Sequence, residues 1–308
     1  ALRLRHLFLG MNFHYLYISR KAVFVSCLYD LSDYELELVF SDTIGYTPRQ
    51  LLSSLALEED EMLQAFCADE LDEPLDSGKR VRFYDRIRSS SLAKILLEKS
   101  GEARRLLLSY LRQEGFLGSE KPGIVDIGWK GNTNRVLNYI LRREEDTNAY
   151  LSFFLGVKET RHPIASIGDY EAGYYFEDYL DEPEYAYNLF ALVYVLENYF
   201  SASDDTTLSR YREEDGTIYP EFSPGIISDA SKEKNQYILR LTEGFLDLIM
   251  ESGLLRYDPS SLFGDVGVPT LLRLASRPSM AELRVLRELT FNDIYVGDRK
   301  VVLKMYPW

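Results

Sequence analysis

The segment from Gly123 to Leu141 constrains the fold of this 308-residue chain more than any other part. It opens with a short β-branched run that ends at Asp126, and a loop with two glycines follows. Apolar residues at helical spacing then fill Asn134–Leu141, which predicts an amphipathic helix. The order strand, glycine-rich turn and helix is typical of one unit of an α/β fold.

The same turn has the composition of an anion-binding loop. Free N–H groups and the helix dipole at a helix N-terminus attract negative charge, and glycine lets the backbone approach a ligand closely. Lys130 adds a cation and Thr133 adds a hydroxyl, so we predict a site for a phosphorylated sugar, although an ordinary tight turn is the alternative. Trp129 would either stack on the sugar or anchor the loop in the core. The predicted binding residues are Gly128, Trp129, Lys130, Gly131, Asn132 and Thr133.

A second predicted strand, Phe13–Ser19, is rich in aromatic residues and is followed by the cations Arg20 and Lys21. Ligands of open α/β sheets bind beyond the carboxyl ends of the strands. If the two strands are neighbours, these cations and Lys130 face one crevice, where they would hold a phosphate or pyrophosphate. Asp126 would hold Mg²⁺ there or accept a sugar hydroxyl. The alternative is a solvated basic surface.

The pattern of elements predicts the fold class. Predicted strands alternate with helices over the first 160 residues, which indicates an α/β fold with a mainly parallel sheet of Rossmann-like type. We expect an α/β core over residues 1–180 and a largely helical portion over 181–308, packed as one compact unit. Further predicted elements are helices at Asp33–Leu38, from Thr47, at Val81–Gly115, Tyr185–Phe200, Ser231–Gly253, Pro269–Ala275 and Met280–Leu289, a hairpin at Asp215–Gly216, and strands at Leu151–Gly156, Gly173–Phe176 and Val301–Met305.

Composition excludes several classes of function. A net charge of −14 argues against general nucleic-acid binding, because a phosphate backbone needs clustered cations. No apolar run is long enough for a transmembrane helix. Cys27 and Cys67 lie in apolar sequence and are predicted to be core thiols. Free thiols suit a cytoplasmic location, and the protein could there be associated with the inner face of the membrane. His6, His14 and His162 are too scattered for a zinc motif.

Common catalytic motifs are also missing from the sequence. It contains neither a Walker loop nor a Gly-x-Ser-x-Gly nucleophile elbow. The segment Ser41–Thr43 lacks the second aspartate of a haloacid-dehalogenase-type phosphatase. We therefore do not expect phosphatase chemistry in this chain.

Two segments, Tyr15–Ala22 and Ile124–Asn132, with a weaker likeness at Leu196–Ala202, resemble a known type of domain. This is the phosphoribosyltransferase-like domain of bacterial surface-polysaccharide biosynthesis, which occurs beside haloacid-dehalogenase-like phosphatase domains. The resemblance implies a phosphoribosyltransferase-type sheet and an enzyme that uses Mg²⁺. It would move ribose 5-phosphate from phosphoribosyl pyrophosphate to a glycan hydroxyl, after which a phosphatase partner would remove the 5-phosphate.

The resemblance also implies roles for individual residues. The loop Gly128–Thr133 would bind the 5-phosphate, and Asp126 would face the ribose hydroxyls or the metal. The pyrophosphate would lie against Ser19, Arg20 and Lys21.

One departure from the family pattern concerns acidic residues. The usual loop of the family follows two adjacent acidic residues, whereas here Asp126 is followed by Ile127. Glu197 is the predicted substitute, and either Asp126 or Glu197 would take the acceptor proton. Two alternatives stay open: a non-catalytic α/β module that docks a partner enzyme, and a glycosyltransferase that uses a nucleotide-sugar donor.

Overall fold

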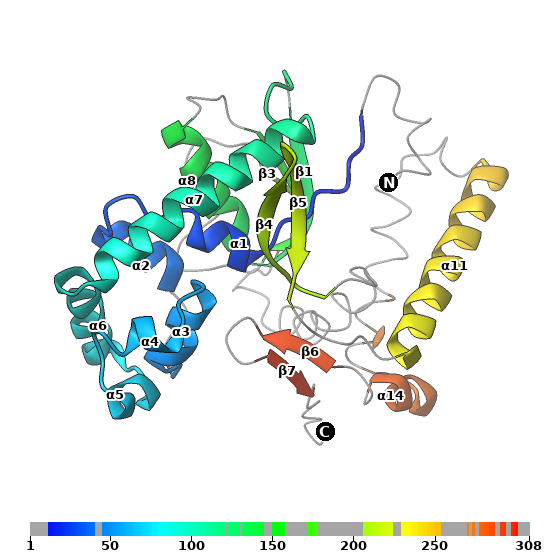
Figure 1. Cartoon of the computed structure of the whole chain (residues 1–308). Coiled ribbons are helices and arrows are strands. Elements are labelled where there is room, and N and C mark those ends of the chain that lie inside the picture. The colour runs from blue at the N-terminus through cyan, green and yellow to red at the C-terminus, as the bar shows by residue number, and fades with distance from the viewer. Residues whose placement is uncertain are drawn as a thin grey trace. The chain divides into compact units, whose positions relative to one another are not determined.

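The structure, a computed structural model, describes residues 12–40, 45–120, 122–129, 131–144, 150–157, 172–177, 206–223, 229–253, 270, 273–274, 277–286, 290–293 and 297–300. It is a mixed α/β protein with small sheets (Figure 1). The chain divides into two compact units. The first, here called the helical unit, comprises residues 1–124, 131–151 and 207–223, and the second unit comprises 125–130, 152–206 and 224–308.

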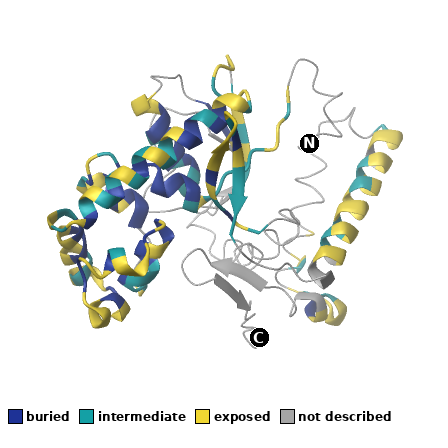
Figure 2. Ribbon diagram, in the orientation of Figure 1, coloured by how far each residue is buried: buried dark blue, intermediate teal, exposed yellow. Residues whose placement is uncertain are grey.

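The helical unit contains helices and one β-hairpin among its described residues. They are α1 (Arg20–Val25), α2 (Asp33–Phe40), α3 (Pro48–Ser54), α4 (Glu59–Met62), α5 (Ala68–Asp72), α6 (Ser77–Ser89), α7 (Leu92–Gln113), α8 (Asn132–Glu144), β4 (Leu208–Glu214) and β5 (Thr217–Phe222). The long helix α7 is central, because α1, α6 and both strands of the hairpin pack on it. Its side chains Leu96, Leu107 and Leu111 are fully buried. Figure 2 shows buried and exposed stretches alternating along α7.

Local sequence explains where several helices begin and end. Thr47 and Gln50 form the predicted start of α3: the Thr47 hydroxyl accepts from the Gln50 N–H at 3.3 Å, and the Gln50 side chain accepts from the Thr47 N–H at 2.9 Å. The predicted helix Val81–Gly115 is two helices. Ser90 adopts an extended conformation between them, and its hydroxyl accepts from the Leu92 N–H at 3.3 Å, so the helix restarts.

The hairpin β4–β5 confirms the predicted turn. Asp215 and Gly216 have φ values of 51° and 76°, as the turn of a two-residue hairpin requires. The side-chain amide of Gln113 on α7 pairs with the edge of β5, donating to the Ile218 carbonyl at 3.0 Å and accepting from its N–H at 2.8 Å. A side chain thus occupies the place of a neighbouring strand.

The predicted strand Phe13–Ser19 is wrong. Residues 12–19 form no regular element, and α1 begins directly after them. The Tyr17 N–H donates to the Tyr110 hydroxyl at 3.0 Å, and the Tyr211 hydroxyl donates to the Tyr17 carbonyl at 2.6 Å. The aromatic ring of Tyr17 packs edge-on against Phe222 at 5.3 Å. Tyrosine hydroxyls of α7 and β4 therefore satisfy backbone groups that a strand would pair with another strand.

The second unit contains the parallel pairing that the sequence predicts. Its described elements are most of β1 (Gly123–Trp129) and of β2 (Leu151–Val157), together with β3 (Ala172–Glu177), α11 (Asp229–Ser252), α14 (Met280–Leu286), β6 (Thr290–Asp293) and β7 (Gly297–Lys300). The strand order is β1-β2-β3, and β2 and β3 run parallel, with Ser152 opposite Ala172. The predicted alternation over the first 160 residues is wrong, because the described elements before residue 122 are all helices.

Other expectations have mixed outcomes. Cys27 is buried as predicted, whereas Cys67 is exposed at the start of α5, so the prediction of a core thiol is wrong for Cys67.

No described helix combines the length and the apolar character needed to cross a membrane. The predicted Tyr185–Phe200 helix and Val301–Met305 strand lie outside the described residues. The hairpin β6–β7 was not predicted, and the boundary at residue 180 stays a prediction.

Candidate functional site

The predicted anion-binding segment forms a strand, a short connection and a helix. Strand β1 runs through Gly128 to Trp129 and α8 begins at Asn132, so the connection is shorter than the predicted loop. Gly131 is buried and has a φ of 62°, a conformation that favours glycine. Lys130 lies outside the described residues.

The first turn of α8 is firmly positioned. The first hydrogen bond of the helix runs from the Arg135 N–H to the Gly131 carbonyl at 2.9 Å, and the N–H groups of the preceding residues point out of the helix end. The buried Tyr150 hydroxyl donates to the Asn134 carbonyl at 2.9 Å, and its ring packs on Phe116. Thr133 is half-buried, and its hydroxyl has no hydrogen-bond partner among the described residues.

Arg135 adds a cation that the sequence analysis missed. Its Nε atom is buried and has no acceptor within the described part of the chain. Because side chains of a helix tilt toward its N-terminus, we expect the Arg135 side chain to extend toward the first turn of α8. A buried donor without an acceptor is costly, especially on a charged group. An anion bound at this helix end would supply the acceptor.

Asp126 lies half-buried on β1. The described residues contain no group of three or more His, Cys, Asp or Glu side chains that could hold a metal. Mg²⁺, however, commonly takes one or two carboxylates together with water and substrate phosphates. Asp126 already has an interaction partner within the protein, and the Mg²⁺ site stays a prediction that depends on this one carboxylate. Glu197, the other predicted catalytic carboxylate, lies outside the described residues.

The second predicted motif is a helix start. The Ser19 hydroxyl caps α1 by accepting from the Ala22 N–H at 3.1 Å, and it donates to the Leu208 carbonyl of β4 at 2.8 Å. Both hydrogen-bonding functions of this hydroxyl are thus used within the protein. Helix α1, which carries Arg20 and Lys21 in its first turn, packs against α8. Helices α1 and α8 are therefore in contact, but the predicted arrangement of two neighbouring strands whose ends face one crevice is wrong, because residues 13–19 form no strand.

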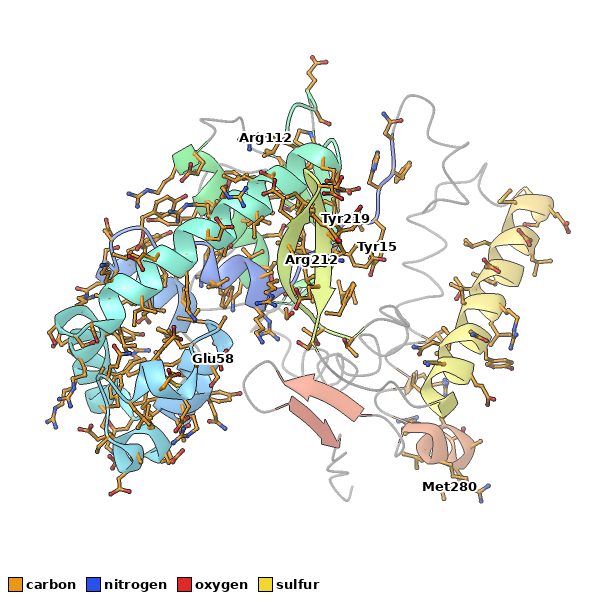
Figure 3. The ribbon with its side chains drawn as sticks, in the orientation of Figure 1. Tyr15, Glu58, Arg112, Arg212, Tyr219 and Met280 are labelled. Carbon is orange, nitrogen blue, oxygen red and sulfur yellow. The ribbon has the colours of Figure 1, made fainter. Side chains whose placement is uncertain are left out.

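Lys21 also lines a cleft of about 710 Å³ within the helical unit. Ala22, Val25, Leu106 and Tyr211 supply apolar lining, and the charged residues Glu58 and Arg212 lie at the same cleft (Figure 3). The remaining lining residues are Ser54, Ala56, Glu98, Lys99, Glu102, Ala103, Ser209, Arg210, Glu213 and Glu221.

The charges of this cleft are mostly paired. Lys99 contacts Glu61 at 2.8 Å and Arg210 contacts Glu221 at 2.8 Å, while Arg212 pairs with Glu214. Lys21 makes no ion pair with the described residues. The other charged residues that line the cleft are three cations and five glutamates, so Lys21 is a cation without a described ion-pair partner in a cleft that is acidic on balance.

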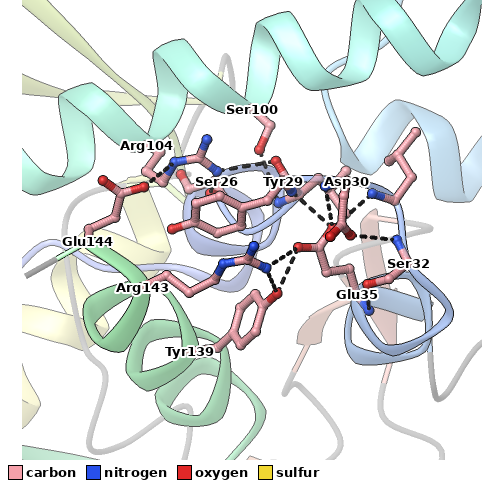
Figure 4. A network of polar contacts seen from close by, with 12 residues as sticks. Ser26, Tyr29, Asp30, Ser32, Glu35, Ser100, Arg104, Tyr139, Arg143 and Glu144 are labelled. Atoms are coloured by element: carbon pink, nitrogen blue, oxygen red, sulfur yellow. Dashed lines mark hydrogen bonds and ion pairs between the residues drawn. The ribbon is translucent and has the colours of Figure 1, made fainter. Parts of the chain in front are cut away.

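A separate polar network surrounds the fully buried Glu35 (Figure 4). One carboxylate oxygen accepts from three successive N–H groups, those of residues 29–31, at 2.9 to 3.0 Å. The other accepts from the Tyr139 hydroxyl at 2.7 Å and from Arg143 at 3.3 Å. Five donors use most of the acceptor capacity of this carboxylate, so Glu35 holds the loop before α2 and is a poor candidate for proton transfer.

The ring of Tyr29 lies between two cations of this network. The guanidinium carbons of Arg104 and Arg143 are 3.6 and 4.3 Å from its centroid, on opposite faces in Figure 4. Burial raises the pKa of the Tyr29 hydroxyl, so it stays protonated at neutral pH. Arg104 also donates to the Ser26 carbonyl at 3.0 Å and pairs with Glu144 at 3.1 Å. The network joins α7, α8 and the loop after α1.

Lys21, Gly131 and Thr133 were predicted from the sequence and their role in binding stays a prediction, whereas Arg135 and the cleft were not predicted. The signal for Arg135 in the sequence was its place in the first turn of the predicted helix. A cation is unfavourable there, because the N-terminal end of a helix dipole is positive. The cleft had no local signal, because its lining comes from segments far apart in the sequence. This sequence matches no known protein family, and no curated protein shows a significant match to it.

Proposed function

We propose that this protein is a phosphoribosyltransferase that moves ribose 5-phosphate from phosphoribosyl pyrophosphate to a glycan hydroxyl, in the cytoplasm. One observation carries the proposal: the helix end after β1 combines a left-handed Gly131 with a buried Arg135 Nε that has no acceptor among the described residues. A phosphate ester supplies the missing negative charge. The parallel pair β2–β3 agrees with a phosphoribosyltransferase-type sheet, which is part of the proposal.

The donor would be held at both of its charged ends. The N–H groups at the start of α8, the Thr133 hydroxyl and Lys130 would bind the 5-phosphate, with Gly128, Trp129 and Asn132 forming the rest of this site. Arg20 and Lys21 would bind the pyrophosphate. Lys21 lines a cleft of a size typical of small-molecule sites, which supports its part of this assignment, whereas Arg20 is exposed and does not line that cleft.

Asp126 would hold Mg²⁺, which when bound offsets the charge of the leaving pyrophosphate. In the transfer, the bond between the anomeric carbon and pyrophosphate breaks with positive charge developing on the sugar. The acceptor oxygen forms the new bond from the opposite face and gives its proton to a carboxylate on that face, which would be Glu197 if Asp126 holds Mg²⁺ and Asp126 if it does not. This displacement inverts the anomeric configuration, so we expect a β-linked product, and NMR coupling constants that indicate an α linkage would contradict it.

Calorimetry with phosphoribosyl pyrophosphate and Mg²⁺ tests the proposal. We expect Lys130→Ala and Arg135→Met each to weaken binding about tenfold or more, because each removes a contact to a charged group. The matched control is Arg82→Ala, which removes an exposed cation of α6 and should leave binding unchanged.

Three outcomes would overturn the proposal. The first is the absence of binding at millimolar donor. The second is preferential binding of a nucleotide sugar, which indicates the other class of glycosyltransferase. The third is binding of a phosphatase domain without affinity for any sugar phosphate, which indicates a docking module.

A further inference from the structure

Helix α11 presents an apolar stripe to solvent. The exposed fractions of Tyr237, Leu241, Phe245 and Leu248 are 57%, 56%, 60% and 62%. Their spacing of four, four and three residues puts them on one face of the helix. Figure 2 shows α11 as largely exposed along its length. A contiguous apolar face of this kind marks an interaction surface.

We propose that a second copy of this chain covers this face, with the two α11 helices packed antiparallel around a two-fold axis at Leu241. The stripe has the symmetry that such an interface requires. Leu241 lies at the middle of the 24-residue helix, and the aromatic residues Tyr237 and Phe245 lie four positions on either side of it. In an antiparallel pair, Tyr237 of each copy therefore meets Phe245 of the other.

The charge distribution along α11 favours the antiparallel orientation. The first half, Asp229–Arg240, has a net charge of +1, whereas the second half, Leu241–Ser252, has a net charge of −3. A parallel pair would place the two acidic halves side by side. An antiparallel pair places each acidic half beside the basic half of the other copy.

The helix dipole adds to this preference. The acidic residues Glu243, Asp247 and Glu251 lie in the C-terminal half, and the last turn carries no cation, so the charge opposes the dipole of α11. The N-terminal end of an antiparallel neighbour would bring positive potential to this half. The same acidic charge disfavours an anionic membrane surface as the occupant.

The size of the surface sets the expected affinity. A helix of 24 residues is about 36 Å long. One pair of such helices buries less than the roughly 1,600 Å² of a standard interface. We therefore expect a reversible, concentration-dependent dimer and not an obligate one.

Analytical ultracentrifugation of the full chain over roughly 1 µM to 1 mM tests self-association. We expect a monomer–dimer equilibrium that Leu241→Glu and Phe245→Glu each weaken at least tenfold, with unchanged circular dichroism. Val81→Glu is the matched control, since it makes the same kind of change at an exposed apolar residue of α6 and should leave the dimer intact. A wild-type chain that stays monomeric throughout, or variants that dimerise normally, would overturn the proposal.

Disulfide trapping tests the orientation. In a Cys67→Ser background, which removes the exposed native thiol, Tyr237→Cys protein is mixed with Phe245→Cys protein under mild oxidation. An antiparallel pair gives a cross-link between the two different variants, whereas Tyr237→Cys alone gives none. A cross-link between two copies of the Tyr237→Cys variant would reject the antiparallel arrangement. Binding of the wild-type chain to phosphatidylcholine vesicles without any dimer would identify a lipid surface as the occupant instead.

Discussion

Helices α7 and α11 have similar lengths, 22 and 24 residues, and similar amphipathic patterns, yet their apolar faces have different environments. Leu107 and Leu111 of α7 are fully buried, whereas Leu241 and Phe245 of α11 are more than half exposed. The pattern of a helix therefore predicts which face will be covered but not what covers it. For α7 the cover is the rest of its own unit, and for α11 we infer a second copy.

The polar side of α7 differs from that of α11 as well. Arg104 binds backbone carbonyls after α1, the Tyr29 ring and Glu144, and Lys99 donates to the Ala56 carbonyl at 2.7 Å. Helix α7 is thus held on its apolar and polar sides by neighbours within one unit.

The largest difference should come from the apolar faces. We expect Leu107→Ala to lower the free energy of unfolding by about 2–5 kcal/mol, because it leaves a cavity in the core. Leu241→Ala should change it by less than about 0.5 kcal/mol in dilute protein, where α11 is unpaired with a second copy. Urea denaturation at low protein concentration measures both values. Equal losses in the two variants would mean that α11 is buried within its own chain.

The polar sides should differ by a smaller amount. Arg104→Met keeps the apolar stem but removes hydrogen bonds to a carboxylate and to carbonyls, so we expect a loss of about 1.5–3 kcal/mol. Arg240→Met in α11 is the matched control and should cost under about 0.5 kcal/mol. A double-mutant cycle with Glu144→Gln checks the cause, since the two losses should not add if the pair is coupled. Fully additive losses would assign the effect of Arg104 to its carbonyl hydrogen bonds and its contact with the Tyr29 ring, and not to the pair with Glu144.

Hydrogen exchange should separate the backbones of the two helices. Amides in the middle of α7 should open only with global unfolding, because they lie in a packed core. Amides of α11 should exchange at least about tenfold faster in dilute protein, and more slowly as the concentration rises and the dimer forms. Mass spectrometry at two concentrations measures both effects. If the protection of the α11 amides from exchange were as high as that of α7 and independent of protein concentration, the proposed difference between the two helices would be wrong.

Short-range patterns in the sequence predicted the elements well. The Thr47–Pro48 helix start, the Asp215–Gly216 turn and the strand–glycine–helix order around Gly131 all depend on a few adjacent residues, and the structure contains them. The predicted strand Phe13–Ser19 failed because the partners of Tyr17 are Tyr110 and Tyr211, which lie far away in the sequence.

The same limit applies to the candidate site. Gly131 and Thr133 follow from local composition, whereas the donors to Glu35 come from residues 29–31, Tyr139 and Arg143, which no spacing rule connects. The cleft at Lys21 is lined by separate elements for the same reason. Contacts between residues far apart in the sequence thus decide which charged side chains have ion-pair partners and which do not.

The smallest expected effect concerns an ion pair on the exposed side of α7. The hydrogen bond from Arg105 at 2.8 Å lowers the pKa of the Glu102 carboxyl below its ordinary value of 4.5. Because the folded pKa is the lower one, the pair stabilises the fold above about pH 4.5, and this contribution disappears as the pH falls through the lowered pKa. Both side chains are half exposed, so the contribution is only a few tenths of a kcal/mol.

Glu102→Gln should therefore be slightly less stable than the wild type at pH 7. At strongly acidic pH, where the Glu102 carboxyl is protonated in both the folded and the unfolded protein, the two should be equally stable. In an Arg105→Met background the same substitution should have no effect at either pH, because the partner that lowers the pKa is gone. Thermal unfolding across this pH range measures both comparisons. If the deficit of Glu102→Gln persisted unchanged in acid, the stabilisation would come from side-chain packing and not from the ion pair with Arg105.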